Sequence, residues 1–189
     1  MKRIIPVILA AGIMMLGACK EKKQTEEIIT TKYVPKKPGA PIRMQDNKGT
    51  ENVVWGGATY ELTVSRNAVD SLPMVSNEIG QKYVDNRIRL TIRRKDGSVF
   101  FDKSFTKSSF TSYLPADYRQ MGLLTDMRFN KVNGGELAFV VTIAEPEATE
   151  DEFLPLELSV NRNGGIGIKV MDDMDLLGGR DDIGDDEGV

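Results

Sequence analysis

The feature that most constrains the fold is a pair of alternating segments, residues 86–94 and 99–105, joined by a loop that contains Asp96-Gly97. In the first segment every second residue is aliphatic, and the residues between them are arginine or threonine. Such alternation is typical of a half-buried β-strand, and Asp-Gly is typical of a type I′ hairpin turn. The two segments therefore predict an antiparallel hairpin with one apolar and one polar face.

The same pattern predicts the register of this hairpin. A two-residue loop at Asp96-Gly97 pairs Ile92 with Phe101 and Ile88 with Phe105. A loop one residue longer sets aliphatic side chains opposite polar ones, because a one-residue slip exchanges the two faces of a strand. We therefore expect the first register, with Ile88, Ile92 and their partners on the buried face.

Further segments also have strand character. They are residues 58–66, 123–132, 136–144, 153–161 and 166–170. Residues 137–141 are apolar without alternation, which predicts a central strand buried on both faces. Asn-Gly-Gly occurs twice between these segments as turn chemistry. At the second of these turns, a three-residue loop would pair Val160 with Ile168 and Leu158 with Val170.

The chain has little helical character. Residues 114–122 have a proline near their start and a glycine at their end, which predicts one short helix. The fold class is therefore all-β, an antiparallel meander of about seven to eight strands. Such a sheet must bury its apolar face, either by curling into a barrel or by folding over as a sandwich. We expect a lipocalin-like barrel or half-barrel, with a β-sandwich as the alternative.

The N-terminus has the anatomy of a secretory signal. Lys2 and Arg3 precede an uncharged apolar run, residues 4–16, which is shorter than the roughly 20 residues of a membrane-spanning helix. The run ends in Leu16-Gly17-Ala18-Cys19, which resembles a bacterial lipobox. The resemblance implies that Cys19 is acylated and that residues 1–18 are removed, so that the partner of the mature N-terminus is the lipid bilayer.

Charge and composition divide the rest of the chain. Residues 19–50 are rich in lysine and proline, which favours a flexible tether after the lipidated cysteine. Residues 51–171 contain the strands and are expected to form a single β domain. Residues 172–189 are strongly acidic, which predicts a disordered tail. Because Cys19 is the only cysteine, no disulfide can form within the chain.

The composition excludes several kinds of chemistry. The chain has no histidine, which removes Ser-His-Asp triads and histidine-ligated zinc. No glycine-rich phosphate loop opens a helix, and we expect no metal and no cofactor. The mature chain is acidic, so nucleic acid is not an expected partner. Carboxylates remain available for hydrolysis, and the candidates are Asp85, Asp102, Asp117, Asp126, Glu136 and Glu145.

Two groups of residues are candidates for ligand binding. An arginine stripe on residues 86–94 could hold an anion if its face lines a cavity, and otherwise faces solvent. Aromatic residues beside glycines or in irregular segments could stack on a sugar or could serve as core. The candidate ligand-binding residues are Arg87, Arg89, Arg93, Trp55, Tyr113 and Tyr118.

The whole chain resembles small cell-envelope lipoproteins of Gram-negative bacteria from uncharacterised families, on the basis of its lipobox, tether and β-meander. That resemblance implies anchoring in the outer membrane, facing the periplasm or the cell surface. It also implies a non-enzymatic binding or assembly module whose ligand is an unknown small molecule, glycan or envelope protein. The alternative is a carboxylate-dependent glycan hydrolase or a glycan-binding accessory protein.

Overall fold

The computed structural model describes residues 37–149 and 152–171, which contain ten strands and two short helical elements. In chain order they are β1 (Asn47–Trp55), β2 (Ala58–Ala68), β3 (Val75–Ser76), β4 (Lys82–Tyr83), β5 (Asn86–Arg94), β6 (Val99–Phe105), η1 (Lys107–Tyr113), α1 (Ala116–Met121), β7 (Leu123–Asn133), β8 (Glu136–Ala144), β9 (Leu154–Val160) and β10 (Ile166–Val170). All seven strands expected from the sequence are present. The additional strands are β1, β3 and β4. Within these described residues, no helix is long and apolar enough to cross a membrane.

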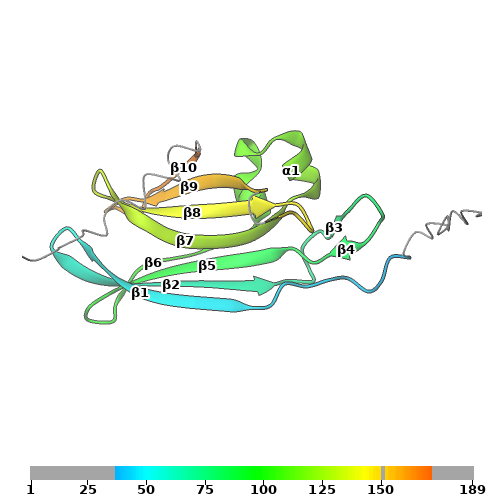
Figure 1. The fold of residues 1–189 in the computed structure, drawn as a ribbon. Helices are drawn as coiled ribbons and strands as arrows, with labels where there is room; N and C mark the ends of the chain where they lie inside the picture. Colours follow the sequence, from blue (N-terminus) through cyan, green and yellow to red (C-terminus); the bar gives the residue numbers. More distant parts are fainter. Residues whose placement is uncertain (1–36, 150–151, 172–189) are drawn as a thin grey trace, which may run out of the picture. The chain divides into compact units, whose positions relative to one another are not determined.

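The strands form two four-stranded antiparallel sheets and a small ribbon (Figure 1). The first sheet has the order β1-β2-β5-β6, the second has the order β10-β9-β8-β7, and β3 pairs with β4. The all-β antiparallel prediction is confirmed, and the organisation is that of the sandwich alternative. The expected barrel is wrong for the described chain, because η1 and α1 separate β6 from β7 and these two strands do not pair.

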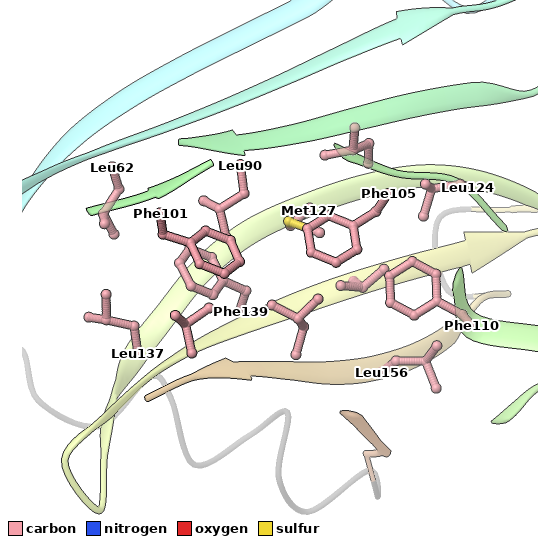
Figure 2. Packing of buried hydrophobic residues seen from close by; sticks show 14 of the residues in the cluster. Leu62, Leu90, Phe101, Phe105, Phe110, Leu124, Met127, Leu137, Phe139 and Leu156 are labelled. Atoms are coloured by element: carbon pink, nitrogen blue, oxygen red, sulfur yellow. The ribbon is translucent and has the colours of Figure 1, made fainter. Parts of the chain in front are cut away.

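The core lies between the two sheets (Figure 2). From the first sheet, the alternation of β5 directs Ile88, Leu90 and Ile92 inward, and each is 0% exposed. From the second sheet, β8 contributes Phe139, which is also 0% exposed. Burying a large aliphatic or aromatic side chain contributes about 1.5–3 kcal/mol. Strand β8 lies between β7 and β9 and is buried on both faces, as its unbroken apolar run predicted.

The β5–β6 hairpin has the predicted register but a different turn. Ile92 pairs with Phe101 and Ile88 with Phe105, as expected. Asp96 does not have a positive φ, and only Gly97 does, at 83°. The backbone bonds join Gly97 N–H to the Arg94 carbonyl and Arg94 N–H to the Ser98 carbonyl. The loop therefore has three residues and is not a type I′ turn.

A β-bulge reconciles the longer loop with the predicted register. The pairing shifts between Ile92 and Arg93, where Arg93 pairs with Val99 and Phe100 is the extra residue of β6. A two-residue loop would instead have paired Arg93 with Phe100, so this pairing, which the predicted loop implied, is wrong. A bulge absorbs one residue without reversing the faces beyond it. Turns with two positive φ values lie instead at Gly56-Gly57, with φ of 59° and 80°, where a two-residue loop joins β1 to β2, and at Gly134-Gly135, with φ of 55° and 85°, where another joins β7 to β8.

The β9–β10 hairpin differs from its predicted register by two residues. Val160 pairs with Ile166, and Leu158 pairs with Ile168. The loop has the expected three residues but starts one position earlier, because Asn161 closes it. The Asn161 side-chain Oδ1 accepts bonds from the backbone N–H groups of residues 163 and 165, at 2.9 and 2.8 Å. These bonds between the asparagine side chain and the loop backbone fix the start of the turn, and the alternation of the strands does not predict them.

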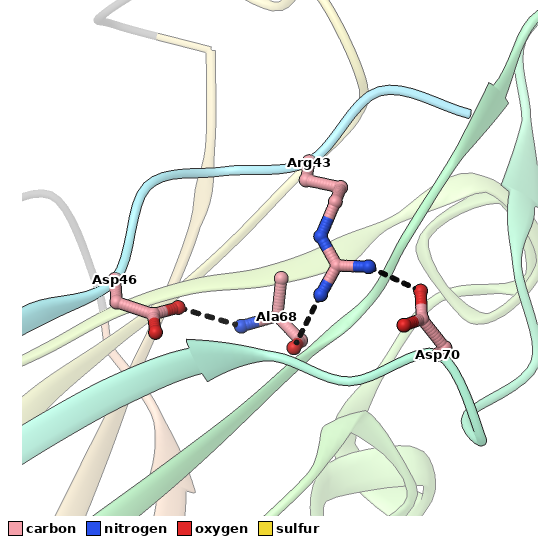
Figure 3. A network of polar contacts seen from close by, with 4 residues as sticks. All are labelled: Arg43, Asp46, Ala68 and Asp70. Atoms are coloured by element: carbon pink, nitrogen blue, oxygen red, sulfur yellow. Dashed lines mark hydrogen bonds and ion pairs between the residues drawn. The ribbon is translucent and has the colours of Figure 1, made fainter. Parts of the chain in front are cut away.

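Part of the segment expected to be a tether lies against the β domain. Strand β1 begins at Asn47. Just before it, the Arg43 guanidinium pairs with Asp70 and donates to the Ala68 carbonyl at 3.1 Å (Figure 3). Asp46 accepts from the Ala68 backbone N–H at 3.3 Å. These contacts fasten the approach to β1 along the end of β2. The signal segment, Cys19, residues 20–36 and the acidic tail lie outside the described residues.

Candidate functional site

The arginine stripe lies on the outer face of the first sheet and faces solvent. Arg89 donates to Asp102 through Nε at 2.7 Å and through Nη2 at 2.5 Å. The Arg93 guanidinium donates to the Gly97 carbonyl at 3.3 Å, and Arg87 is exposed. Asp102 lies across from Thr91, as expected for a solvent-facing stripe. The hollows that Arg89 and Arg93 line on this face are open troughs beside β1 and β2.

Trp55 is a core residue. It is 1% exposed, and its indole N–H donates to the Gly135 carbonyl at 2.8 Å. Tyr60 and Phe100 contact its ring edge-on or tilted, at centroid distances of 5.1 and 5.4 Å. The Arg162 guanidinium lies 5.0 Å from the ring centroid. Because its ring is buried and its indole N–H is bonded, Trp55 caps this end of the sandwich and presents no ring to a ligand.

The two candidate tyrosines do not form a platform with the other candidates. Tyr113 ends η1 and is 39% exposed. Tyr118 lies on α1 and packs, partly buried, against the core. Burial raises the pKa of its hydroxyl. The structure therefore places the arginine stripe, Trp55 and the tyrosines in separate regions, while Cys19 is outside the described residues.

A different set of residues surrounds a pocket at the other end of the sandwich. This end pocket encloses about 270 Å³ between the segment before β3, the start of β5, and the elements η1 and α1. Residues 72–75 form its apolar wall. Its polar side chains are Asp85, Thr106, Lys107, Ser108, Thr111, Arg119 and Gln120. Ligand pockets typically measure about 300–1,000 Å³, so this one suits a small molecule or one terminal group of a larger one.

Asp85 is the buried charge of the end pocket. It directly precedes β5 and is 3% exposed. Its Oδ1 accepts the backbone N–H groups of Asn86 at 2.8 Å and Leu124 at 3.0 Å, and so joins the start of β5 to the start of β7. Among the described residues, no hydrogen bond engages its Oδ2. One carboxylate oxygen is therefore structural, and the other remains available where the residue lines the pocket.

Two cations share the pocket with Asp85. The Lys107 ammonium donates to the Gly122 carbonyl at 2.7 Å. The Arg119 Nε donates to the Leu114 carbonyl at 2.8 Å. No ion pair within the described chain joins either cation to Asp85, since each is held by a backbone carbonyl. The pocket therefore contains one carboxylate and two cationic groups that are not paired with each other.

Burial shifts the titration of both groups at the base of the pocket. It raises the pKa of the Asp85 carboxyl, against the lowering effects of its backbone hydrogen bonds and of the Lys107 charge. Burial also lowers the pKa of the Lys107 ammonium, against the raising effect of Asp85. Such perturbed groups gathered in a pocket are typical of functional sites.

The side of the sandwich between β2 and β7 has a second hollow, which a single arginine partly closes. Arg66 on β2 donates from Nη1 to the Thr125 carbonyl on β7, and from Nη2 to the Gln45 carbonyl at 3.0 Å. Its Nε is buried without a hydrogen-bond partner among the described residues. Arg66 therefore joins the two sheets through its two terminal nitrogens, while its Nε is left without a bond to the described residues.

The sequence marks Asp85 only as one of six candidate carboxylates, and it does not mark Lys107 or Arg119. These residues come from irregular segments or from the ends of elements, where no periodic pattern marks a shared face. The structure also shows no group of three or more acidic, histidine or cysteine side chains placed to hold a metal ion, within the part of the chain that it describes. The end pocket thus carries polar and ionic groups suited to binding.

The fold and the pocket together define a two-sheet antiparallel β domain with a small polar site at one end. The chain belongs to a family described as a domain of unknown function, DUF4738, whose model matches residues 27–168. This match includes residues 27–46 ahead of β1 as well as every strand except the last residues of β10. A search of the curated proteins finds no match to the chain.

Proposed function

We propose that this protein is a lipid-anchored lipoprotein of the bacterial envelope whose β domain is a non-enzymatic module that binds a small molecule in the end pocket. The lipobox-like Leu16-Gly17-Ala18-Cys19 supports the anchor. The observation that carries the binding role is Asp85, a buried carboxylate with one uncommitted oxygen in a pocket that also holds two cations. The anchor would hold this pocket at the outer membrane, on its periplasmic or outer surface.

The contents of the pocket favour binding over glycan hydrolysis. Glycoside hydrolysis usually needs two carboxyl groups roughly 5–10 Å apart, one of which acts as the acid. Asp85 is the one carboxylate among the described residues that line the end pocket, and its Oδ1 is held by two backbone N–H groups. The other charged residues that line the pocket are the cations Lys107 and Arg119, which cannot serve as the second acid.

Metabolic labelling tests the anchor. Cells that express the full chain are grown with a fatty-acid analogue, and incorporation is compared between the native sequence and Cys19→Ser. We expect labelling only of the native sequence. Equal incorporation in the Cys19→Ser chain would refute lipidation at this residue, whatever the outcome for the pocket.

A ligand screen tests the binding role. The non-lipidated chain of residues 19–189 carrying Cys19→Ser is titrated with neutral sugars, amino acids and organic acids, while backbone amide shifts are followed by NMR. We expect at least one class to move the amides of residues 106–111 and 119–122 together. A result in which no class moves these amides would contradict a binding role for the end pocket.

A further inference from the structure

The uncommitted hydrogen-bonding groups of the end pocket are mostly donors. An ammonium has three N–H donors and a guanidinium has five. Lys107 uses one of its donors on Gly122, and Arg119 uses Nε on Leu114. Within the described residues, no hydrogen bond engages the remaining donors of either side chain. Against this surplus, the charged acceptor left over is Asp85 Oδ2. A ligand that satisfies such a pocket must supply several acceptors and about one donor.

The hydroxyl groups of η1 add adaptable partners beside the cations. Thr106 Oγ1 and Ser108 Oγ lie 2.7 Å apart and share a hydrogen bond. Thr111 donates its hydroxyl to the Ser108 carbonyl at 3.2 Å, which leaves its oxygen able to accept. These groups hold η1 together and can rotate to meet a polar ligand. They do not change the balance of charge, which is two cations against one carboxylate.

The opposite wall limits the ligand to a partly apolar molecule. Residues 72–75 form this wall, with Val75 3% exposed at its base and Met74 40% exposed at its rim. An alkyl group or the apolar face of a sugar ring can pack against the rim. A bare inorganic anion would leave the apolar wall uncovered. Each methylene group of a ligand that becomes buried against this wall should strengthen binding roughly fourfold.

From these contacts we propose that the end pocket binds a small hydroxylated organic anion. Its carboxylate would be held by Lys107 and Arg119, its hydroxyl would donate to Asp85 Oδ2, and its carbon skeleton would pack against residues 72–75. The proposal rests on the binding role given to this pocket above and names its ligand class. Free hydroxy acids and terminal uronic acid residues share this chemistry, and they differ in size.

A matched set of probes tests each part of the proposal on the non-lipidated chain of residues 19–189 that carries Cys19→Ser. Lactate has the carboxylate and the hydroxyl, propionate has only the carboxylate, and 1,2-propanediol has only hydroxyl groups. Amide shifts in NMR titrations should give lactate a Kd of about 1 mM. Propionate should bind several-fold more weakly than lactate, and the diol at least tenfold more weakly. Glucuronate distinguishes the sources, because tighter binding than lactate indicates a glycan end and weaker binding indicates a free hydroxy acid.

Variants then assign the contacts. Lys107→Met keeps the aliphatic stem and should weaken lactate and propionate binding at least tenfold. Asp85→Asn should weaken lactate binding toward that of propionate while leaving propionate little changed. Lys103→Met, on β6 and away from the pocket, is the matched control and should bind lactate as the parent chain does. Because Lys107 also bonds the Gly122 carbonyl, Arg119→Met provides a second cation variant if the first one unfolds.

Two outcomes would overturn the proposal. One is 1,2-propanediol binding at the end pocket as tightly as lactate, or a neutral sugar binding there while no anion does; the binding role would then stand with a different ligand class. The other is lactate moving amides of the arginine stripe instead of those of residues 106–111. If neither anions nor neutral compounds move the amides of the end pocket, the binding role itself fails.

Discussion

Strands β5 and β8 hold equivalent inner positions in their sheets, yet their outer faces differ. In β5 every second residue is buried, and Arg87, Arg89 and Arg93 lie exposed between them. In β8 the outer face is buried as well, with Ala138 1% and Val140 4% exposed. Concentrated charge on a regular strand therefore marks the solvent face of the first sheet. Among the described residues, buried charged side chains lie at Asp85, just before β5, and at Glu157, within β9. Lys107, after β6, is half-buried.

Truncating an inward-facing side chain should lower the free energy of unfolding more than any other change considered, and by a similar amount in β5 and β8. Phe139→Ala on β8 removes a fully buried ring and should lower the free energy of unfolding by about 3–5 kcal/mol. Ile92→Ala on β5 should cost about 2–5 kcal/mol for the same reason. Chemical denaturation monitored by circular dichroism measures both. A cost below about 1 kcal/mol at either position would show that the sheets do not share one core.

An asparagine substitution on the outer face should destabilise β8 much more than β5. Val140→Asn on β8 loses apolar burial and places an amide among buried groups, so that it should cost about 2–4 kcal/mol. Thr91→Asn on β5 is the matched change at a less buried outer position and should cost less than about 1 kcal/mol. The difference between the two variants, measured by the same denaturation method, is the test. Equal costs would mean that the outer faces are equally open to water.

The alternation within β5 and β6 was enough to predict their faces and their register, because apolar burial decides both. The turn type was not predictable in the same way. A three-residue loop and a bulge at Phe100 give the same pairing as a two-residue loop, and alternation cannot distinguish them. The sandwich also depended on information outside the strands, since η1 and α1 carry the chain from β6 to β7 and prevent these strands from pairing.

The end pocket could not be predicted for a related reason. Asp85, Lys107 and Arg119 are separated in sequence, and none of them belongs to an alternating strand, so that only the pairing of the strands brings them together. The arginine stripe, by contrast, was visible because it is local, and it proved to face solvent. A pattern within one strand indicates which of its faces is exposed to solvent. A binding site assembled from three connections leaves no such local signal.

The Asp-Gly loop offers a smaller effect that distinguishes turn chemistry from packing. Gly97 has φ of 83°, and a Cβ built there has no atom within 4 Å. Gly97→Val should therefore lower the free energy of unfolding by about 1–3 kcal/mol through backbone strain alone. Gly97→Asn should cost less, because asparagine tolerates this conformation. The order of the two variants in thermal denaturation is the measurement, and the reverse order would contradict a strained left-handed position.

The buried carboxylate should give stability a pH dependence opposite in sign to that of the Arg89–Asp102 pair, because burial raises the pKa of Asp85 whereas Arg89 lowers the pKa of Asp102. Burial raises the pKa of Asp85 above its ordinary value of 3.8. As the pH rises from that value to the raised folded pKa, the unfolded chain has lost a proton that the folded chain still holds, so stability falls. Asp85→Asn removes this titration and keeps an oxygen for the Leu124 and Asn86 N–H groups. The unfolding free energy of the variant relative to the parent should therefore increase with pH across this window, by roughly 1.4 kcal/mol per unit of the pKa rise.

Denaturation midpoints at a series of pH values from about 3 upward measure this difference. Below 3.8 the Asp85 carboxyl is protonated in both states, so that the difference there reports only the change of shape and hydrogen bonding. A difference that stays constant with pH would show that the folded protein does not raise the pKa of Asp85. A difference that decreases with pH would show that hydrogen bonds to the ionised form outweigh burial.

The smallest effect is expected on the arginine stripe itself. Arg89→Ala removes a pair with Asp102 in which the side chains are 59% and 31% exposed. Water and salt screen such a pair, and the two ions are stabilised nearly as well apart as together. The thermal midpoint should change by no more than about 3 °C, and the change should shrink further at high salt. Lactate affinity at the end pocket should be unaltered, because Arg89 lies on the outer face of the sheet. A large loss of stability would mean that the pair supports the fold, and a loss of lactate binding would mean that the stripe, rather than the end pocket, holds the anion.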